Sequence, residues 1–298
     1  MHRSAGRSSA PPISRRRVWL SLAATTAAAA CPTLAPIAAG AAELAPEIKA
    51  IKDRGELIVG MTRFDSPPFY YQRRVDGAGR AAALAGWDVE FAQDLARLLD
   101  VKLTMHREAP AFNDVVDLVS AGMVDLAVSK LSITPRRALA VQFTAPSIDL
   151  RHALLVNRTA MAKRGGSADI KALLHRDFDG TLGVIANSSY AETARRIFTR
   201  ASLREFSSWD EVVDAANLGL VDLAYRDELE IKKLMRLRPE LRLNLGSALI
   251  IDERDSIAFA VPSRSPQLLS VLNVMLARRR MYDANRLLER YSDIFGAA

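Results

Sequence analysis

Apolar residues follow two different spacings along most of the chain, and these spacings predict strands and helices in turn. Short apolar runs, such as Glu56–Met61 and Thr181–Ala186, are typical of buried strands. The segment Gly86–Asp100 instead carries its apolar residues on one face of a helix, with Asp88 and Glu90 near the positive N-terminal end. The alternation of the two patterns predicts an α/β fold with largely parallel sheets.

One helix–turn–strand unit occurs twice, as FNDVVDLVSAGMVDLAVSK from Phe112 and WDEVVDAANLGLVDLAYRD from Trp209. The copies begin 97 residues apart and align without gaps. In each copy a helical pattern ends at a glycine, Gly122 or Gly219, which is the residue that most easily takes a left-handed helix end. A short apolar strand follows. The repeat predicts two structurally similar halves.

Polar residues follow the two repeated strands at equivalent positions: Lys130 follows the first strand, and Asp227 follows the second. The stretch SITPRR beyond Lys130 adds Ser132, Arg136 and Arg137. Because ligands bind beyond the carboxyl ends of parallel strands, we expect a cleft with a cationic wall and an anionic wall. Arginine binds carboxylates through two parallel donors, and an aspartate accepts an ammonium group, so the pattern favours a free amino acid. Taken singly, Arg137 is explained more simply as a surface residue and Asp227 as a helix cap, so the site assignment depends on their pairing across the two halves.

The first 42 residues form a pattern different from the rest of the chain. They hold five arginines and no acidic residue, then the apolar run Val18–Ala30 and a stretch of small residues. This order predicts an export signal, because the run is shorter than the roughly 20 residues that span a bilayer. The segment SRRRVWL resembles the twin-arginine export motif, with ordinary secretion as the alternative. We expect cleavage near Ala41 or Ala42.

Removing this signal changes what the composition implies. The formal charge falls from +7 to +2, which weakens the case for a nucleic-acid partner. The only cysteine, Cys31, lies in the signal, so we expect no disulfide and no thiolate nucleophile in the mature chain. A lipid anchor there requires a larger residue than Ala28 three positions earlier. Histidines without metal-ligand spacing predict no metal site, and GAGRAA from Gly77 follows a polar stretch, which favours a hairpin turn over a dinucleotide-binding loop. We expect no cofactor.

Three segments together resemble the family-3 solute-binding proteins, the periplasmic receptors of amino-acid uptake transporters: GWDVEFAQDLARLL, VDLAVSKLSITPRRALAVQFTAP and GLVDLAYRDE. The resemblance runs from about Glu56 to Tyr291 and implies a type II periplasmic-binding-protein fold. Each lobe would be a mostly parallel sheet flanked by helices, and two crossover strands would join the lobes. After the signal at 1–42, the first lobe would hold 43–148 and 256–298, and the second 149–255. The implied protein is a periplasmic monomer that closes on its ligand and serves an ABC-transporter permease.

By position, the resemblance assigns the ligand carboxylate to Arg137 and the ligand ammonium group to Asp227. It assigns a hydroxyl or amide donor to Ser132. Phe112 falls where the family often places an aromatic ring over the ligand; a helix-flanking core residue is the alternative.

The second-lobe carboxylate loop of the family falls on Ser188 and Ser189. Asn187 stands where the family has a glycine, and Lys130 stands where a small residue is usual, so both are departures. Arg63, in a loop that contributes to the family's side-chain pocket, and Lys130 would both favour a side-chain carboxylate. We therefore expect an acidic amino acid, glutamate or aspartate.

Two other functional classes remain open. Periplasmic dehydratases that act on prephenate- or arogenate-like acids share this fold, but such chemistry needs a placed acid or base. Glu192 is explained more simply as a favourable charge at a helix start. A ligand-sensing module is disfavoured because the chain ends at Ala298 without an output domain. We expect a binding protein, not an enzyme.

Overall fold

A nine-stranded mixed sheet, whose strands lie between Glu56 and Pro262, forms the centre of this computed structural model, which describes residues 43–73, 83–164 and 178–295. Eight strands form the main path, and β6 (Val141–Phe143) pairs with β11 beside it. The order along the path is β4 (Lys102–Ala109), β1 (Glu56–Thr62), β5 (Leu126–Ser132), β11 (Leu245–Pro262), β7 (Ile148–Asn157), β10 (Leu223–Asp227), β8 (Thr181–Ile185) and β9 (Ser202–Phe206).

Two sets of parallel strands lie at the two ends of this path. β4, β1 and β5 are parallel to one another, and so are β10, β8 and β9. We call them the first and second half-sheets. Between them β7 and β11 pair antiparallel with each other over most of their length, and each also pairs antiparallel with the adjoining half-sheet. The chain therefore crosses between the half-sheets along two long neighbouring strands.

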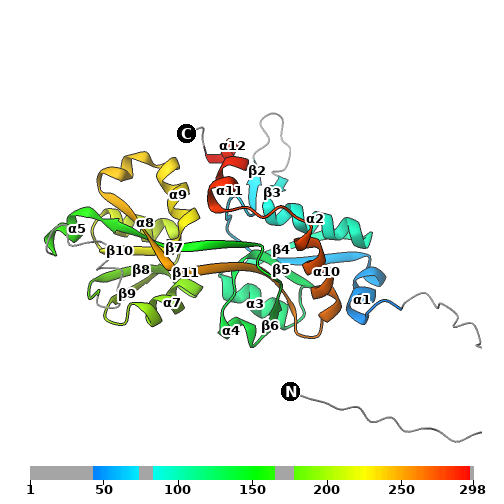
Figure 1. The fold of residues 1–298 in the computed structure, drawn as a ribbon. Coiled ribbons are helices and arrows are strands. Elements are labelled where there is room, and N and C mark those ends of the chain that lie inside the picture. Colours follow the sequence, from blue (N-terminus) through cyan, green and yellow to red (C-terminus); the bar gives the residue numbers. More distant parts are fainter. Residues whose placement is uncertain (1–42, 74–82, 165–177, 296–298) are drawn as a thin grey trace, which may run out of the picture. The chain divides into compact units, whose positions relative to one another are not determined.

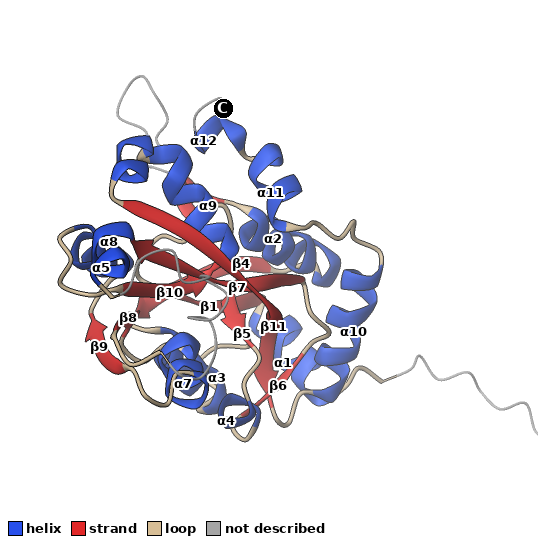
Figure 2. Cartoon of the chain, turned by 60° about the vertical axis from the view of Figure 1, so that its left-hand side comes forward, coloured by secondary structure: helices blue, strands red, loops and turns tan. Residues whose placement is uncertain are grey.

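Helices cover both faces of the sheet (Figures 1 and 2). Alternate residues of β5 contact different faces. Leu126 and Val128 join the buried cluster that includes helix α2 (Trp87–Leu99), whereas Ala127 and Leu131 join the cluster that includes helix α3 (Phe112–Ser120). A strand that is buried on both faces needs an apolar residue at nearly every position. The helices are α1 (Pro46–Arg54), α2 (Trp87–Leu99), α3 (Phe112–Ser120), α4 (Pro135–Ala138), α5 (Arg158–Lys163), α7 (Ser189–Ile197), α8 (Trp209–Asn217), α9 (Glu228–Leu237), α10 (Pro266–Ala277), α11 (Ala284–Arg290), α12 (Ser292–Phe295) and the 3-10 helix η1 (Pro239–Leu243).

The predicted repeat is present in the fold. α3 leads through Gly122 to β5, and α8 leads through Gly219 to β10. The two glycines have φ values of 71° and 72°, in the left-handed region that a residue with a Cβ rarely adopts. The two helix–turn–strand units thus place equivalent residues at the inner edges of the two half-sheets.

Some expectations fall outside the described residues. These are the export signal with Cys31 and the turn at Gly77; the strands on either side of that turn, β2 (Tyr71–Arg73) and β3 (Ala83–Ala85), pair antiparallel. Within the described ranges, the helices are too short or too polar to cross a membrane.

Candidate functional site

One small cavity between the half-sheets gathers every predicted site residue except Arg63. The predicted residues that line it are Phe112, Lys130, Ser132, Arg137, Ser188, Ser189 and Asp227. Its volume is about 10 Å³, close to the space that one water molecule needs. The cleft is therefore closed in this conformation, and an amino acid could enter only if the two walls separated.

Arg137 is held rigidly but keeps one donor free. It lies on the short helix α4, which Thr134 caps by accepting from the Arg137 backbone N–H at 3.2 Å. Its Nε donates to Oδ1 of Asn113 and its Nη1 donates to the carbonyl of Ser132, both at 3.0 Å. Nη2 is buried and has no hydrogen-bond partner among the described residues. Burial lowers the pKa of Arg137 to about 10, which leaves the guanidinium charged at neutral pH.

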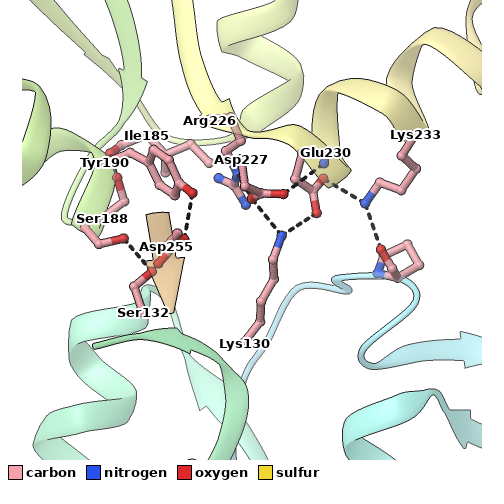
Figure 3. A network of polar contacts seen from close by, with 12 residues as sticks. Lys130, Ser132, Ile185, Ser188, Tyr190, Arg226, Asp227, Glu230, Lys233 and Asp255 are labelled. Atoms are coloured by element: carbon pink, nitrogen blue, oxygen red, sulfur yellow. Dashed lines mark hydrogen bonds and ion pairs between the residues drawn. The ribbon is translucent and has the colours of Figure 1, made fainter. Parts of the chain in front are cut away.

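Lys130 lies within β5, not after the strand as predicted, and its side chain crosses to the second half-sheet. Nζ donates to Oδ2 of Asp227 at 2.9 Å and to Oε1 of Glu230 at 2.8 Å (Figure 3). Its backbone N–H donates to the buried carboxylate of Asp88 at 3.0 Å. Burial disfavours the ammonium charge, but the carboxylates of Asp227 and Glu230 outweigh burial and raise the pKa of Lys130. The ammonium group is thus a fixed positive charge inside the cleft.

Asp227 both caps a helix and accepts an ammonium group. Oδ1 accepts from the backbone N–H of Glu230 at 3.0 Å, which caps α9, and Oδ2 accepts from Lys130. Lys233, one turn further on, contacts Glu230 at 2.7 Å and donates to the carbonyl of Pro67 in the opposite wall at 2.9 Å. In this conformation, therefore, the ammonium group bound to Asp227 belongs to the protein itself.

The serine loop of the second half-sheet keeps the shape that a glycine would allow. Asn187 has a φ of 54°, and asparagine tolerates this left-handed region better than most residues with a Cβ. Ser188 then caps α7 by accepting from the Ala191 backbone N–H at 3.2 Å. Ser189 shares a hydroxyl–hydroxyl hydrogen bond of 2.8 Å with Ser132 across the cleft. The departure at Asn187 therefore preserves the turn.

Four residues that sequence reasoning missed also line the cavity: the apolar Ile257 and the polar Tyr190, Arg226 and Asp255. The Tyr190 hydroxyl donates to Oδ2 of Asp255 at 2.6 Å, and burial together with the nearby carboxylate keeps the pKa of Tyr190 well above its usual value. The Arg226 guanidinium lies 5.6 Å from the centre of the Trp209 ring. Its Nε is buried, lies 3.6 Å from Oδ2 of Asp227 and makes no hydrogen bond to the described residues.

Arg63 does not join these residues. Its side chain is exposed, and it is not part of the cavity lining. Phe112 does reach the cavity, where its ring is buried and packs edge-on against Phe64 at 5.4 Å between centres. The predicted cationic pair of Arg63 and Lys130 is therefore not assembled in this conformation.

The groups considered for catalysis lie apart from the cavity or have structural partners. Glu192 is exposed on the first turn of α7, as expected of a charge at a helix start. His152 is buried against the hydroxyl of Tyr225, and burial lowers its pKa. The part of the chain that the structure describes contains no group of three or more metal-ligating side chains.

The fold is that of the type II periplasmic binding proteins, as expected. The amino-acid ABC-transporter substrate-binding protein AbpA of Streptococcus pneumoniae, solved with L-arginine, superimposes with a TM-score of 0.66; it is 24% identical, and the match covers 83% of this chain and 97% of that one. An ancestral amino-acid-binding protein, described as a precursor of cyclohexadienyl dehydratase, gives a TM-score of 0.63 at 22% identity, over 83% and 99% of the two chains.

Similar sequences include both binding proteins and enzymes. The L-cystine-binding protein TcyJ of Escherichia coli K12 is 23% identical over 77% of this chain and 79% of its own length. The glutamate-binding protein GluB of Corynebacterium efficiens is 26% identical over 72% and 70%. The membrane-bound lytic murein transglycosylase F 1 of Alkalilimnicola ehrlichii is 29% identical over 72% of this chain but only 40% of its own length. Binding proteins are thus matched over most of their length, whereas this enzyme shares less than half of its own.

The family model for bacterial extracellular solute-binding proteins, family 3, matches residues 57–293. This range contains both copies of the repeat, the two crossing strands and the whole cavity lining. The chain therefore belongs to the bacterial extracellular solute-binding proteins, family 3.

Proposed function

We propose that this protein captures a small amino acid or related carboxylate in the cleft and delivers it to the permease of an ABC importer. Membership of an extracellular solute-binding family supports capture of a solute. The observation that carries the ligand class is the Nη2 of Arg137, a buried charged donor that has no hydrogen-bond partner among the described residues. Buried polar groups in folded proteins are almost always paired, and a carboxylate is the partner that an arginine fork fits best.

Within this class we favour acidic solutes, so glutamate and aspartate are the first amino acids to test. Arg63 is exposed and does not contribute to this preference. Arg137 and Arg226 lie on opposite walls, and each has a buried nitrogen without a hydrogen-bond partner among the described residues. Leaving such a donor unpaired costs about 1–3 kcal/mol, and a solute with two carboxylates would satisfy both.

Capture requires the cleft to open and close. The proposed lobes, 43–148 with 256–298 and 149–255, would move about β7 and β11, which connect them. Direct contacts between the walls, such as that between Ser132 and Ser189, hold the closed form. A ligand that contacts both walls favours the closed state by its higher affinity for that state. The permease would then recognise the loaded form.

The remaining parts of the proposal concern the route to the cell exterior. The predicted signal at 1–42 would direct the chain to the periplasm, by the twin-arginine pathway or by ordinary secretion. The family is described as extracellular, which supports export in general. We propose that the mature protein acts as a monomer.

A ligand screen by thermal unfolding tests the proposal. The purified protein is heated with each of the twenty amino acids and with a series of dicarboxylates. A ligand that binds only the folded state stabilises it by about 2.7 kcal/mol at a concentration of 100 times Kd, which raises Tm. We expect a rise with at least one carboxylate solute. No rise with any of them would contradict the proposed function.

A further inference from the structure

We propose that Lys130 makes the cleft selective for carboxylate solutes that have no ammonium group, because its own ammonium group already fills the acceptor site on Asp227. This inference rests on the proposed function, capture of a small carboxylate, and narrows its ligand class. Glutarate, the analogue of glutamate without the ammonium group, represents the preferred class.

Lys130 lines the cavity, and its backbone adopts a strained conformation there. Its φ is 47°, in the left-handed region that favours glycine, and its backbone N–H is held by the buried carboxylate of Asp88. Only 5% of the residue is exposed. Strained backbone positions persist where the surroundings impose them and often mark functional sites. Here the strain places a long cationic side chain across the cleft.

The ammonium group of Lys130 has the contacts that a bound ammonium group would need. Nζ lies between Oδ2 of Asp227 at 2.9 Å and Oε1 of Glu230 at 2.8 Å (Figure 3). It also lies 5.3 Å from the centre of the Phe69 ring. Two carboxylates and an aromatic face are typical surroundings for a buried cation. The protein therefore supplies from its own chain the charge that an amino acid would bring.

Binding a second ammonium group at Asp227 would be strongly unfavourable. Sharing Asp227 would bring two positive charges together, and displacing Lys130 would leave its charge buried without a partner. Breaking a buried ion pair changes an equilibrium constant by on the order of a hundredfold or more. The other carboxylate in the lining, Asp255, already accepts from Tyr190 and lies close enough to Arg137 to favour its charged form.

Within the described residues, the lining has buried donors without a hydrogen-bond partner but no buried acceptor without one. Among residues that line the cavity, the buried side-chain atoms without hydrogen-bond partners are Nη2 of Arg137 and Nε of Arg226. Both are donors on cations. A carboxylate offers only acceptors, whereas an ammonium group offers only donors. The charges of the lining also favour an anionic ligand. The lining holds more cationic side chains, those of Lys130, Arg137 and Arg226, than anionic ones, those of Asp227 and Asp255.

Isothermal titration calorimetry with matched ligand pairs tests the inference. The pairs are propionate and alanine, succinate and aspartate, and glutarate and glutamate, each differing only by the α-ammonium group. We expect the wild-type protein to bind the ammonium-free member of the best-fitting pair at least about tenfold more tightly. This comparison needs no variant, so it does not depend on a variant folding.

The variant Lys130→Gly removes the internal ammonium group and suits a φ of 47°. We expect the preference to shift by at least about tenfold toward the amino acid, which can now place its ammonium group on Asp227. Lys233→Ala is the matched control, because Lys233 is also buried on Glu230 but makes no hydrogen bond to Asp227. It should keep the wild-type preference.

The possible failures are distinguishable. If the wild-type protein binds an amino acid as tightly as its ammonium-free partner, or if Lys130→Gly leaves the ratio unchanged, the role of Lys130 is wrong and the capture function stands. If the wild-type protein binds neither these six ligands nor any other carboxylate solute, the proposed function fails, and this inference fails with it.

Discussion

Lys130 and Asp227 occupy the same position in the two copies of the repeat, and their side chains bind each other at 2.9 Å across the cleft. Lys130 lies in β5 and Asp227 in β10, which are the innermost strands of the two half-sheets. The repeat therefore brings a cation from one half against an anion from the other. The alignment of the two repeat copies predicted a charged cleft. It also explains why Lys130 and Asp227 form an ion pair when the cleft is closed.

The first prediction concerns the stability of this pair. Asp227→Ala removes a partner of the buried Lys130 and the cap of α9. Breaking a buried pair from one side costs about 3–5 kcal/mol, so we expect the free energy of unfolding to fall by roughly that amount. Urea unfolding followed by circular dichroism measures it. Asp117→Ala, an exposed aspartate on α3, is the control and should change the free energy by less than about 0.5 kcal/mol. Equal effects of the two substitutions would contradict the importance of the pair.

The second prediction concerns ligand binding by Arg137. Arg137→Lys keeps a positive charge but loses the planar fork, so we expect a loss of affinity of at least about tenfold for any bound carboxylate. Arg136→Ala provides the control, because Arg136 is the exposed neighbour on the same short helix. Calorimetry with the ligand found in the thermal screen compares the two variants. An equal loss in both would mean that Arg137 does not hold the carboxylate.

The third prediction is a pH dependence that arises from Asp88. Burial raises the pKa of Asp88 to about 7, although the backbone N–H of Lys130 partly opposes the shift. The unfolded chain therefore loses this proton near pH 4, while the folded chain keeps it until about pH 7. Between these values the unfolded state binds fewer protons, so this group lowers stability as pH rises, by up to about 1.4 kcal/mol per pH unit.

Asp88→Asn keeps an acceptor for Lys130 but cannot ionise. Urea unfolding of the variant and the wild-type protein at several values between pH 4 and 7 isolates the contribution of Asp88 to the free energy of unfolding. All other titrating groups are common to the two proteins. We expect the variant to gain stability relative to the wild-type protein as pH rises through this range. A constant difference between the two proteins would show that Asp88 has an ordinary pKa.

The elements and the general place of the site could be predicted because they depend on local patterns. Helical and strand spacing, and the glycines that end α3 and α8, predicted both repeated units. The repeat register then predicted that Lys130 and Asp227 would occupy corresponding positions in the two halves, although Lys130 lies within β5 and not after it. These inferences use only residues that are close together in the sequence, or a symmetry that is visible in it.

The contacts across the cleft could not be predicted in the same way. The direct bond between Lys130 and Asp227 depends on how far the walls close. Arg226 was overlooked because strand alternation places it opposite Asp227, yet both reach the cavity at the end of β10. Asp255 follows an irregularity in the pairing of β11 with β7 between Ile250 and Arg254, which shifts the register in a way that no spacing rule reveals.

The fourth prediction tests the turn that carries the serine loop. Asn187 has a φ of 54°, so Asn187→Gly should leave the free energy of unfolding within about 0.5 kcal/mol of the wild-type value. Asn187→Val should destabilise the protein by about 1–3 kcal/mol, because a β-branched residue is strained in this region. It should also weaken ligand binding, since Ser188 and Ser189 follow directly and line the cavity. Thermal unfolding with and without ligand measures both effects. If valine were tolerated as well as glycine, the left-handed turn would not be what positions these serines.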